Sequence, residues 1–163
     1  MSVDRGTVRA RGFMLIELVI AVAILGVLAA MAVPMLQVTA QRQKEAELRS
    51  ALRDLRKAID AYRQAAAERT IQVPADASGY PPSLDDLVRG VPDISRPDHR
   101  PIRFLRRLPR DPMHPDGSVP AAATWGTRDY RSAHEDPRAG DDVYDVYSLS
   151  PGVGLNGVPY RAW

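Results

Sequence analysis

The chain has 163 residues, enough for a membrane segment and one small globular domain. Its formal net charge is +2, and the first twelve residues carry that whole excess, with three arginines against one aspartate. The charge-balanced remainder gives no case for nucleic-acid binding, and the absence of cysteine excludes disulfides, zinc–thiolate sites and thiol catalysis.

The first predicted element is a membrane-spanning helix. An apolar run of 24 residues extends from Phe13 to Leu36, and Glu17 is its only charged residue. As a helix this run spans about 36 Å, enough to cross a bilayer core of about 30 Å. The arginines before it predict a cytoplasmic N-terminus and an exported remainder. The alternative is a cleaved secretory signal peptide, but the apolar core of such a peptide is shorter, about 7–15 residues.

Glu17 needs a partner or a shallow position, because a carboxylate at bilayer depth costs about 2–4 kcal/mol. Two interpretations stay open at this point. The side chain either extends to the lipid headgroups without a partner, or it meets a positive group inside a bundle of helices.

The helical period continues beyond Leu36 on one apolar face. Large apolar residues follow one another at spacings of four, three, four and three, namely Leu48, Leu52, Leu55, Ile59 and Tyr62. The opposite face is charged and offers i,i+4 pairs between Glu45 and Arg49 and between Arg56 and Asp60. We therefore predict one helix from about Phe13 to about Glu68, whose second half is covered by a head.

The remaining residues predict that head. Ala77 to Gly90 is typical of a turn and a short helix, with Ser83 as N-cap and with Leu84, Leu87 and Val88 facing the long helix. Short strands are predicted in three places, within Ile102 to Pro112, around Tyr130 and over Asp141 to Leu149. An exposed insertion is expected between Met113 and Trp125. The predicted fold class is α+β, a long N-terminal helical spine (transmembrane, then amphipathic) with a small C-terminal head of short antiparallel strands and loops.

These features resemble a known family. The stretch RGFMLIEL, Arg11 to Leu18, resembles the class III signal sequence of type IV pilins and type II secretion pseudopilins. The head resembles that of the major, G-type pseudopilin in four motifs: Tyr80-Pro81 with Leu84 and Leu87; Leu108-Pro109 with Asp111-Pro112; Trp125-Gly126 with Tyr130; and Asp145, Tyr147, Ser148 and Leu149. The resemblance divides the chain into a leader (1–12), a transmembrane polymerisation half (13–36), an amphipathic half (37–68) and a periplasmic head (69–163).

The resemblance implies a structural subunit of a periplasmic pseudopilus and no enzyme activity. A prepilin peptidase would cleave between Gly12 and Phe13 and methylate the new amine of Phe13. Glu17 would pair with that amine on a neighbouring copy and set the register between subunits. The implied partners are further copies of the chain, minor pseudopilins, the peptidase and the inner-membrane assembly platform. The implied location is the bacterial inner membrane, in a single pass with the head in the periplasm.

The family's major subunit usually holds calcium in the loop after its last strand. Here that loop, Ser150 to Trp163, contains no Asp or Glu, and hard cations prefer charged oxygens. We therefore expect no cofactor. Catalysis is not expected either, since His99, His114 and His134 lie far apart in loops. A basic cluster near Phe104 is either a solvated face or a contact with an acidic patch of the next subunit; its members are Arg103, Arg106, Arg107 and Arg110.

Two other functions stay open. A type IV pilin or minor pilin for adhesion, motility or DNA uptake would share the leader, although adhesive pilins commonly close their C-terminal loop with a disulfide and this chain has no cysteine. A membrane-tethered periplasmic binding or enzymatic module would retain residues 1–12 and would not polymerise.

Overall fold

A computed structural model describes residues 15–163, apart from the side chains of residues 31–34. The chain divides into two compact units, Met1–Ala40 and Gln41–Trp163, and each is described by itself. The predicted cleavage site between Gly12 and Phe13 lies outside the described residues.

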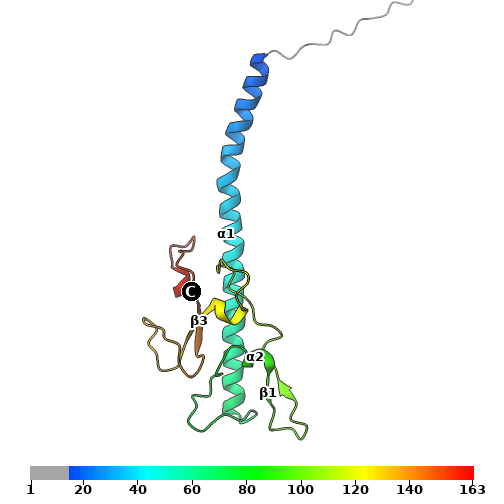
Figure 1. The fold of residues 1–163 in the computed structure, drawn as a ribbon, viewed down its shortest axis with the longest axis vertical. Helices are drawn as coiled ribbons and strands as arrows, with labels where there is room; N and C mark the ends of the chain where they lie inside the picture. The colour runs from blue at the N-terminus through cyan, green and yellow to red at the C-terminus, as the bar shows by residue number, and fades with distance from the viewer. Residues whose placement is uncertain (1–14) are drawn as a thin grey trace, which may run out of the picture. The chain divides into compact units, whose positions relative to one another are not determined.

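The long helix α1 comprises Leu15–Ala67 (Figure 1). Its end agrees with the predicted boundary to one residue. In the first unit, the described side chains of residues 15–36 are all exposed. In the second unit, α1 instead buries one stripe of apolar side chains against the head. The two parts of the helix therefore differ in whether the rest of the chain buries their apolar side chains.

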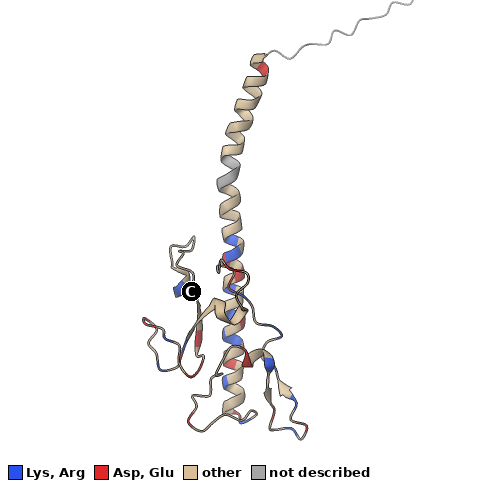
Figure 2. Ribbon diagram, viewed as in Figure 1, with Lys and Arg blue, Asp and Glu red and all other residues tan. Residues whose placement is uncertain are grey.

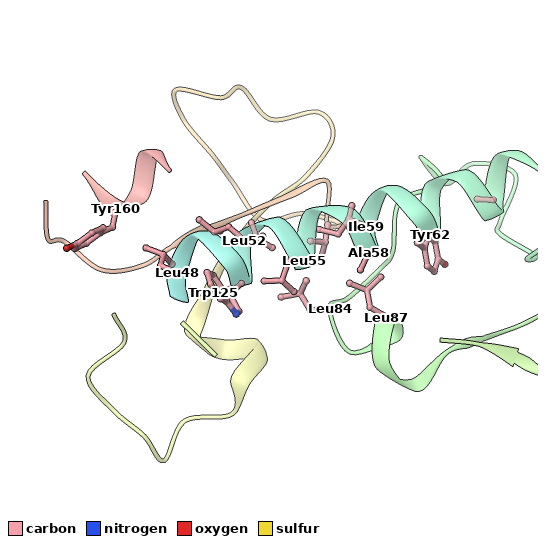
Figure 3. Packing of buried hydrophobic residues seen from close by; sticks show 14 of the residues in the cluster. Leu48, Leu52, Leu55, Ala58, Ile59, Tyr62, Leu84, Leu87, Trp125 and Tyr160 are labelled. Atoms are coloured by element: carbon pink, nitrogen blue, oxygen red, sulfur yellow. The ribbon is translucent and has the colours of Figure 1, made fainter. Parts of the chain in front are cut away.

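The core of the second unit forms around that stripe. Leu48 and Leu55 are fully buried, and Leu84 and Leu87 reach the same cluster from the segment of the short helix α2, Asp86–Arg89 (Figure 3). Trp125 and Tyr160 close the cluster from other parts of the head. The hydrophobic core of the head therefore includes side chains of α1.

Two separate two-stranded antiparallel sheets pack around this core. One pairs β1 (Val91–Pro92) with β2 (Pro101–Ile102). The other pairs β3 (Trp125–Arg128) with β4 (Asp145–Ser148), in a register that sets Trp125 opposite Ser148. The 3₁₀ helices η1 (Ala121–Thr124) and η2 (Tyr160–Ala162) complete the head. The predicted α+β class, with a helical spine and a head of short antiparallel strands, is confirmed.

Several local predictions were wrong. Tyr130 lies in a turn two residues after β3, because Asp129 and Tyr130 bond to Arg138 and Asp142 instead of continuing the ladder. Strand β4 is shorter than the predicted Asp141 to Leu149. Asp85, not Ser83, is the N-cap of α2; Ser83 instead donates both its amide and its hydroxyl to the carboxylate of Asp86. The predicted insertion is exposed at its tip, but it ends in the fully buried Thr124.

Candidate functional site

The first candidate surface is the N-terminal part of α1. Figure 2 shows one acidic position near the start of the helix, and the sequence has no further charged residue between Glu17 and Arg42. That acid, Glu17, lies in the first turn, where a negative side chain is favoured by the helix dipole. Among the described residues, α1 is the one helix long and apolar enough to cross a membrane. An exposed apolar surface of this extent requires lipid or other helices around it.

The second candidate surface is the stripe that carries the head. The five residues predicted for head–spine packing, Leu48, Leu52, Leu55, Ile59 and Tyr62, are each at most 4% exposed. Full burial of one leucine side chain contributes about 2 kcal/mol to the free energy of folding, because its apolar surface is removed from water. The ring of Tyr62 lies 5.3 Å from that of Phe104, centroid to centroid, so the stripe also holds the segment that follows β2.

An ion pair joins α1 to the β3–β4 sheet. Arg56 donates through Nε to Asp145 Oδ1 over 2.9 Å and through Nη2 to the backbone oxygen of Trp163 over 2.8 Å. Arg128 approaches the other oxygen of Asp145 at 3.5 Å. The predicted i,i+4 pair of Arg56 with Asp60 was wrong, because the guanidinium reaches β4 and the C-terminal segment instead of the next turn of its own helix.

Glu45 anchors the C-terminal loop to α1. It is only 3% exposed, and its Oε1 accepts hydrogen bonds from the backbone N–H of Leu155 at 2.8 Å and from the hydroxyl of Tyr160 at 3.0 Å. Gln41 donates to the same carboxylate at 3.2 Å. Burial raises the pKa of Tyr160, and the neighbouring Glu45 raises it further. Glu45 is 3.8 Å from Arg49 as predicted, but it is buried under the C-terminal loop, so its predicted position on the charged face opposite the apolar stripe was wrong.

The loop does not fit a calcium ion. The one side-chain amide oxygen of Ser150 to Trp163, that of Asn156, accepts from the N–H of Val158 at 3.1 Å. Upstream, Asp142 accepts from the N–H of Tyr130, and Asp145 lies between two arginines. Within residues 15–163, no three His, Asp or Glu side chains gather as a metal site would require.

The head motifs meet at a buried carboxylate. Asp111 is 2% exposed; its Oδ2 accepts from the hydroxyl of Ser148 at 2.5 Å, and its Oδ1 accepts from the N–H of Met113 at 2.8 Å. The N–H of Asp111 donates to the hydroxyl of Thr124, and the indole of Trp125 donates to the carbonyl of Pro109 at 2.9 Å. Three sequence motifs of the predicted resemblance therefore form one hydrogen-bonded cluster between β3, β4 and the turn before the insertion.

Comparison with known proteins gives the family. A type II secretion system core protein G from Klebsiella pneumoniae is 30% identical over 142 residues, which cover 83% of this chain and 93% of that protein. The chain belongs to the family of type II secretion system core protein G. The core proteins G of Klebsiella michiganensis and Escherichia coli (strain K12) are 27% and 28% identical, over 82% and 85% of this chain and over 90% and 92% of their own lengths. No family model and no solved structure matches the chain.

Membership in the core protein G family confirms the resemblance to the major pseudopilin. Sequence reasoning named Glu45 only as a partner of Arg49 and missed that it anchors the C-terminal loop. Its signal was the absence of Asp and Glu from the loop, which leaves the loop's own N–H groups to be satisfied by an acceptor elsewhere.

The predicted basic cluster divides in two. Arg110 donates to the carbonyls of Val119 and Asp116, while the other three arginines of the cluster are exposed.

Proposed function

We propose that this chain is a structural subunit of the periplasmic pseudopilus of a type II secretion system, not an enzyme. The observation that carries the proposal is the contrast within α1. The described side chains of residues 15–36 are exposed and include a single acid, whereas later turns of the helix bury one apolar stripe under a head. A helix of this kind is stable only in lipid or among other helices, which is what insertion followed by polymerisation supplies. The family membership supports the same role.

The proposed assembly begins with processing. A prepilin peptidase cleaves between Gly12 and Phe13 on the cytoplasmic side and methylates the new amine of Phe13. The amine carries a positive charge and Glu17 a negative one, so the two groups of neighbouring copies attract each other in a medium of low dielectric. Desolvation offsets most of that attraction, so the pair fixes the axial step between subunits more than it stabilises the filament.

The proposed topology follows from the same features. The three arginines of the leader hold the N-terminus in the cytoplasm, and the head lies in the periplasm after a single crossing of the inner membrane. The mature helix joins other copies of the chain, with minor pseudopilins and the inner-membrane assembly platform as further partners. The C-terminal loop is held by Glu45 without calcium or another cofactor.

The test is intact-mass analysis of the full chain purified from cells that also produce a prepilin peptidase. The expected product lacks residues 1–12 and carries one extra methyl group on Phe13. A Glu17→Ala variant should be cleaved normally and should not form filaments, while the matched Glu47→Ala variant, which removes an exposed acid of the head segment of α1, should do both. Mature protein that still begins with Met1 would overturn the proposal, and normal filaments from Glu17→Ala would overturn the role of Glu17 in setting the register.

A further inference from the structure

A basic groove lies between α1 and the segment that follows β2. It encloses about 460 Å³, and its floor is apolar, with Ala58 and Ala61 from α1 and Phe104 and Leu105 from the facing segment. Three exposed cations stand at its edge, namely Lys57, Arg106 and Arg107, and Asp54 is the one acid among its lining residues. The groove therefore has a net charge of +2, from three cations and one anion.

These cations form no ion pair in the part of the chain that the structure describes, although Asp54 lines the same groove. Several exposed arginines elsewhere in the head do form ion pairs, such as Arg96, Arg100 and Arg138. An apolar floor with an uncompensated basic edge is suited to a partner that brings both apolar contact and carboxylates.

The same head carries a segment of opposite charge. The loop that joins β3 to β4, residues 129–144, contains five acidic residues and two arginines, a net charge of −3. At 16 residues it is longer than most loops without regular structure, and such loops commonly have a function. Glu135 and Asp141 are exposed and form no ion pair within residues 15–163, whereas Asp136 already pairs with Arg138 at 2.6 Å.

The groove and the loop occupy different sides of the head. The groove follows directly on the β1–β2 sheet, and the loop extends from the β3–β4 sheet; Figure 1 shows β1 and β3 on opposite sides of α1. One copy therefore does not bring its own loop to its own groove. Two different complementary surfaces on one molecule make a heterologous contact, which generates a ring if the rotation between copies closes and an open helical array, as a filament requires, if it does not.

We propose that the β3–β4 loop of one copy docks in the basic groove of the next copy, with Glu135 and Asp141 facing Arg106, Arg107 and Lys57. This inference rests on the proposed function, since it places a second contact between subunits in the heads, separate from the contact between apolar helices. A second copy is the occupant that the charges favour, because the surface that complements the groove is present on every head at equal concentration.

Cysteine cross-linking tests the contact, and the chain has no native cysteine to interfere. The full chain with Arg107→Cys and Glu135→Cys is produced in cells that assemble the filament, and then oxidised. The expected result is a ladder of dimers and higher multimers, because docking brings the two positions within the reach of a disulfide. The matched control, Arg100→Cys with Glu135→Cys, replaces an exposed arginine of the β1–β2 turn and should stay monomeric.

Charge reversal tests the chemistry of the contact. Arg106→Glu with Arg107→Glu, or Glu135→Arg with Asp141→Arg, should each lower the amount of assembled filament about tenfold or more, since like charges then face each other. Combining both reversals in one chain should restore assembly. The control Arg96→Glu with Arg100→Glu makes the same charge change away from the groove and should leave assembly unchanged.

The outcomes separate the two proposals. If the parent chain is processed and forms filaments but the paired cysteines give no ladder and the combined reversal does not restore assembly, the docking inference is overturned and the filament function stands. If the parent chain itself is neither processed nor assembled, the proposed function fails, and the docking inference fails with it.

Discussion

The guanidinium of Arg56 lies 2.9 Å from the carboxylate of Asp145 and connects α1 to strand β4 across 89 positions of sequence. Asp145 also faces Arg128, its cross-strand neighbour on β3, so one carboxylate is shared between the helix and the sheet. Because Arg56 in addition holds the backbone oxygen of Trp163, a single side chain fixes β4 and the C-terminal segment on the spine.

Arg56→Met should destabilise the head by about 1–2 kcal/mol. The substitution keeps the aliphatic stem but removes charged hydrogen bonds to Asp145 and Trp163, in a side chain that is 40% exposed and therefore partly compensated by water. Denaturant unfolding of the full chain in detergent measures the difference. Arg53→Met, at an exposed position without an ion pair in the described chain, should change the free energy of unfolding by less than about 0.5 kcal/mol. Equal effects of the two variants would contradict the assignment.

Glu45→Ala should release the C-terminal loop. The substitution leaves the N–H of Leu155 and the hydroxyl of Tyr160 without their acceptor, which costs about 2–3 kcal/mol. Limited proteolysis should show faster cleavage after residue 150 in this variant than in Glu47→Ala.

The wild-type chain should have the same thermal midpoint with excess calcium as with a chelator, because the side-chain oxygens of Asn156 and Asp145 are already engaged by protein groups. A ligand that binds the native state alone raises the midpoint in proportion to its affinity. A calcium-dependent rise in the midpoint would therefore show that the loop binds the ion after all.

Asp111→Asn should destabilise the head by about 1–3 kcal/mol. The carboxylate is buried and accepts from both Ser148 and Met113, and an amide nitrogen in place of one oxygen cannot accept. Ser148→Ala should cost less, because the hydroxyl is one of two donors to that carboxylate. Chemical unfolding compares both with Asp76→Asn, an exposed aspartate for which little change is expected.

The stability of the head should fall at alkaline pH. Burial raises the pKa of Tyr62, and Asp86 raises it further; burial likewise raises the pKa of Tyr160. A tyrosine whose pKa is higher in the folded state binds its proton more tightly there, so its contribution is complete below the unfolded pKa of about 10 and is lost as the pH rises through the folded pKa. Tyr62→Phe, which cannot ionise, should make the free energy of unfolding less dependent on pH above 10. An unchanged alkaline slope in that variant would contradict the prediction.

The long helix and its stripe could be predicted because both depend on local spacing. Leu48, Leu52, Leu55, Ile59 and Tyr62 recur at the helical period, and no competing signal interrupts them. The partners of Arg56 and Glu45 could not be predicted in the same way. The i,i+4 rule considers neighbours on one helix, whereas both side chains bind groups about 90 or more positions away, whose approach is decided by packing of the whole head.

The strands were harder to place than the helix. A Val- and Tyr-rich stretch predicts extended backbone, but Asp142 accepts from the N–H of Tyr130 and Val143 donates to the carbonyl of Pro81, so only Tyr144 bonds to β3, at Arg128. The motifs around Asp111, Trp125 and Ser148 were identified by resemblance and not by strand pattern. The structure gives the physical reason that these residues belong together, since three segments converge on one buried carboxylate.

The two short sheets and α1 pack on one hydrophobic core, and this core decides which truncated fragments of the protein can fold. A fragment that starts at residue 69, after the helix ends, would lose Leu48, Leu55 and Ile59 from its interior together with the side chains of Glu45 and Arg56. The shortest soluble version that can fold should therefore begin near Gln41, where the second compact unit starts. The boundary between the two compact units of this protein therefore lies within one continuous helix.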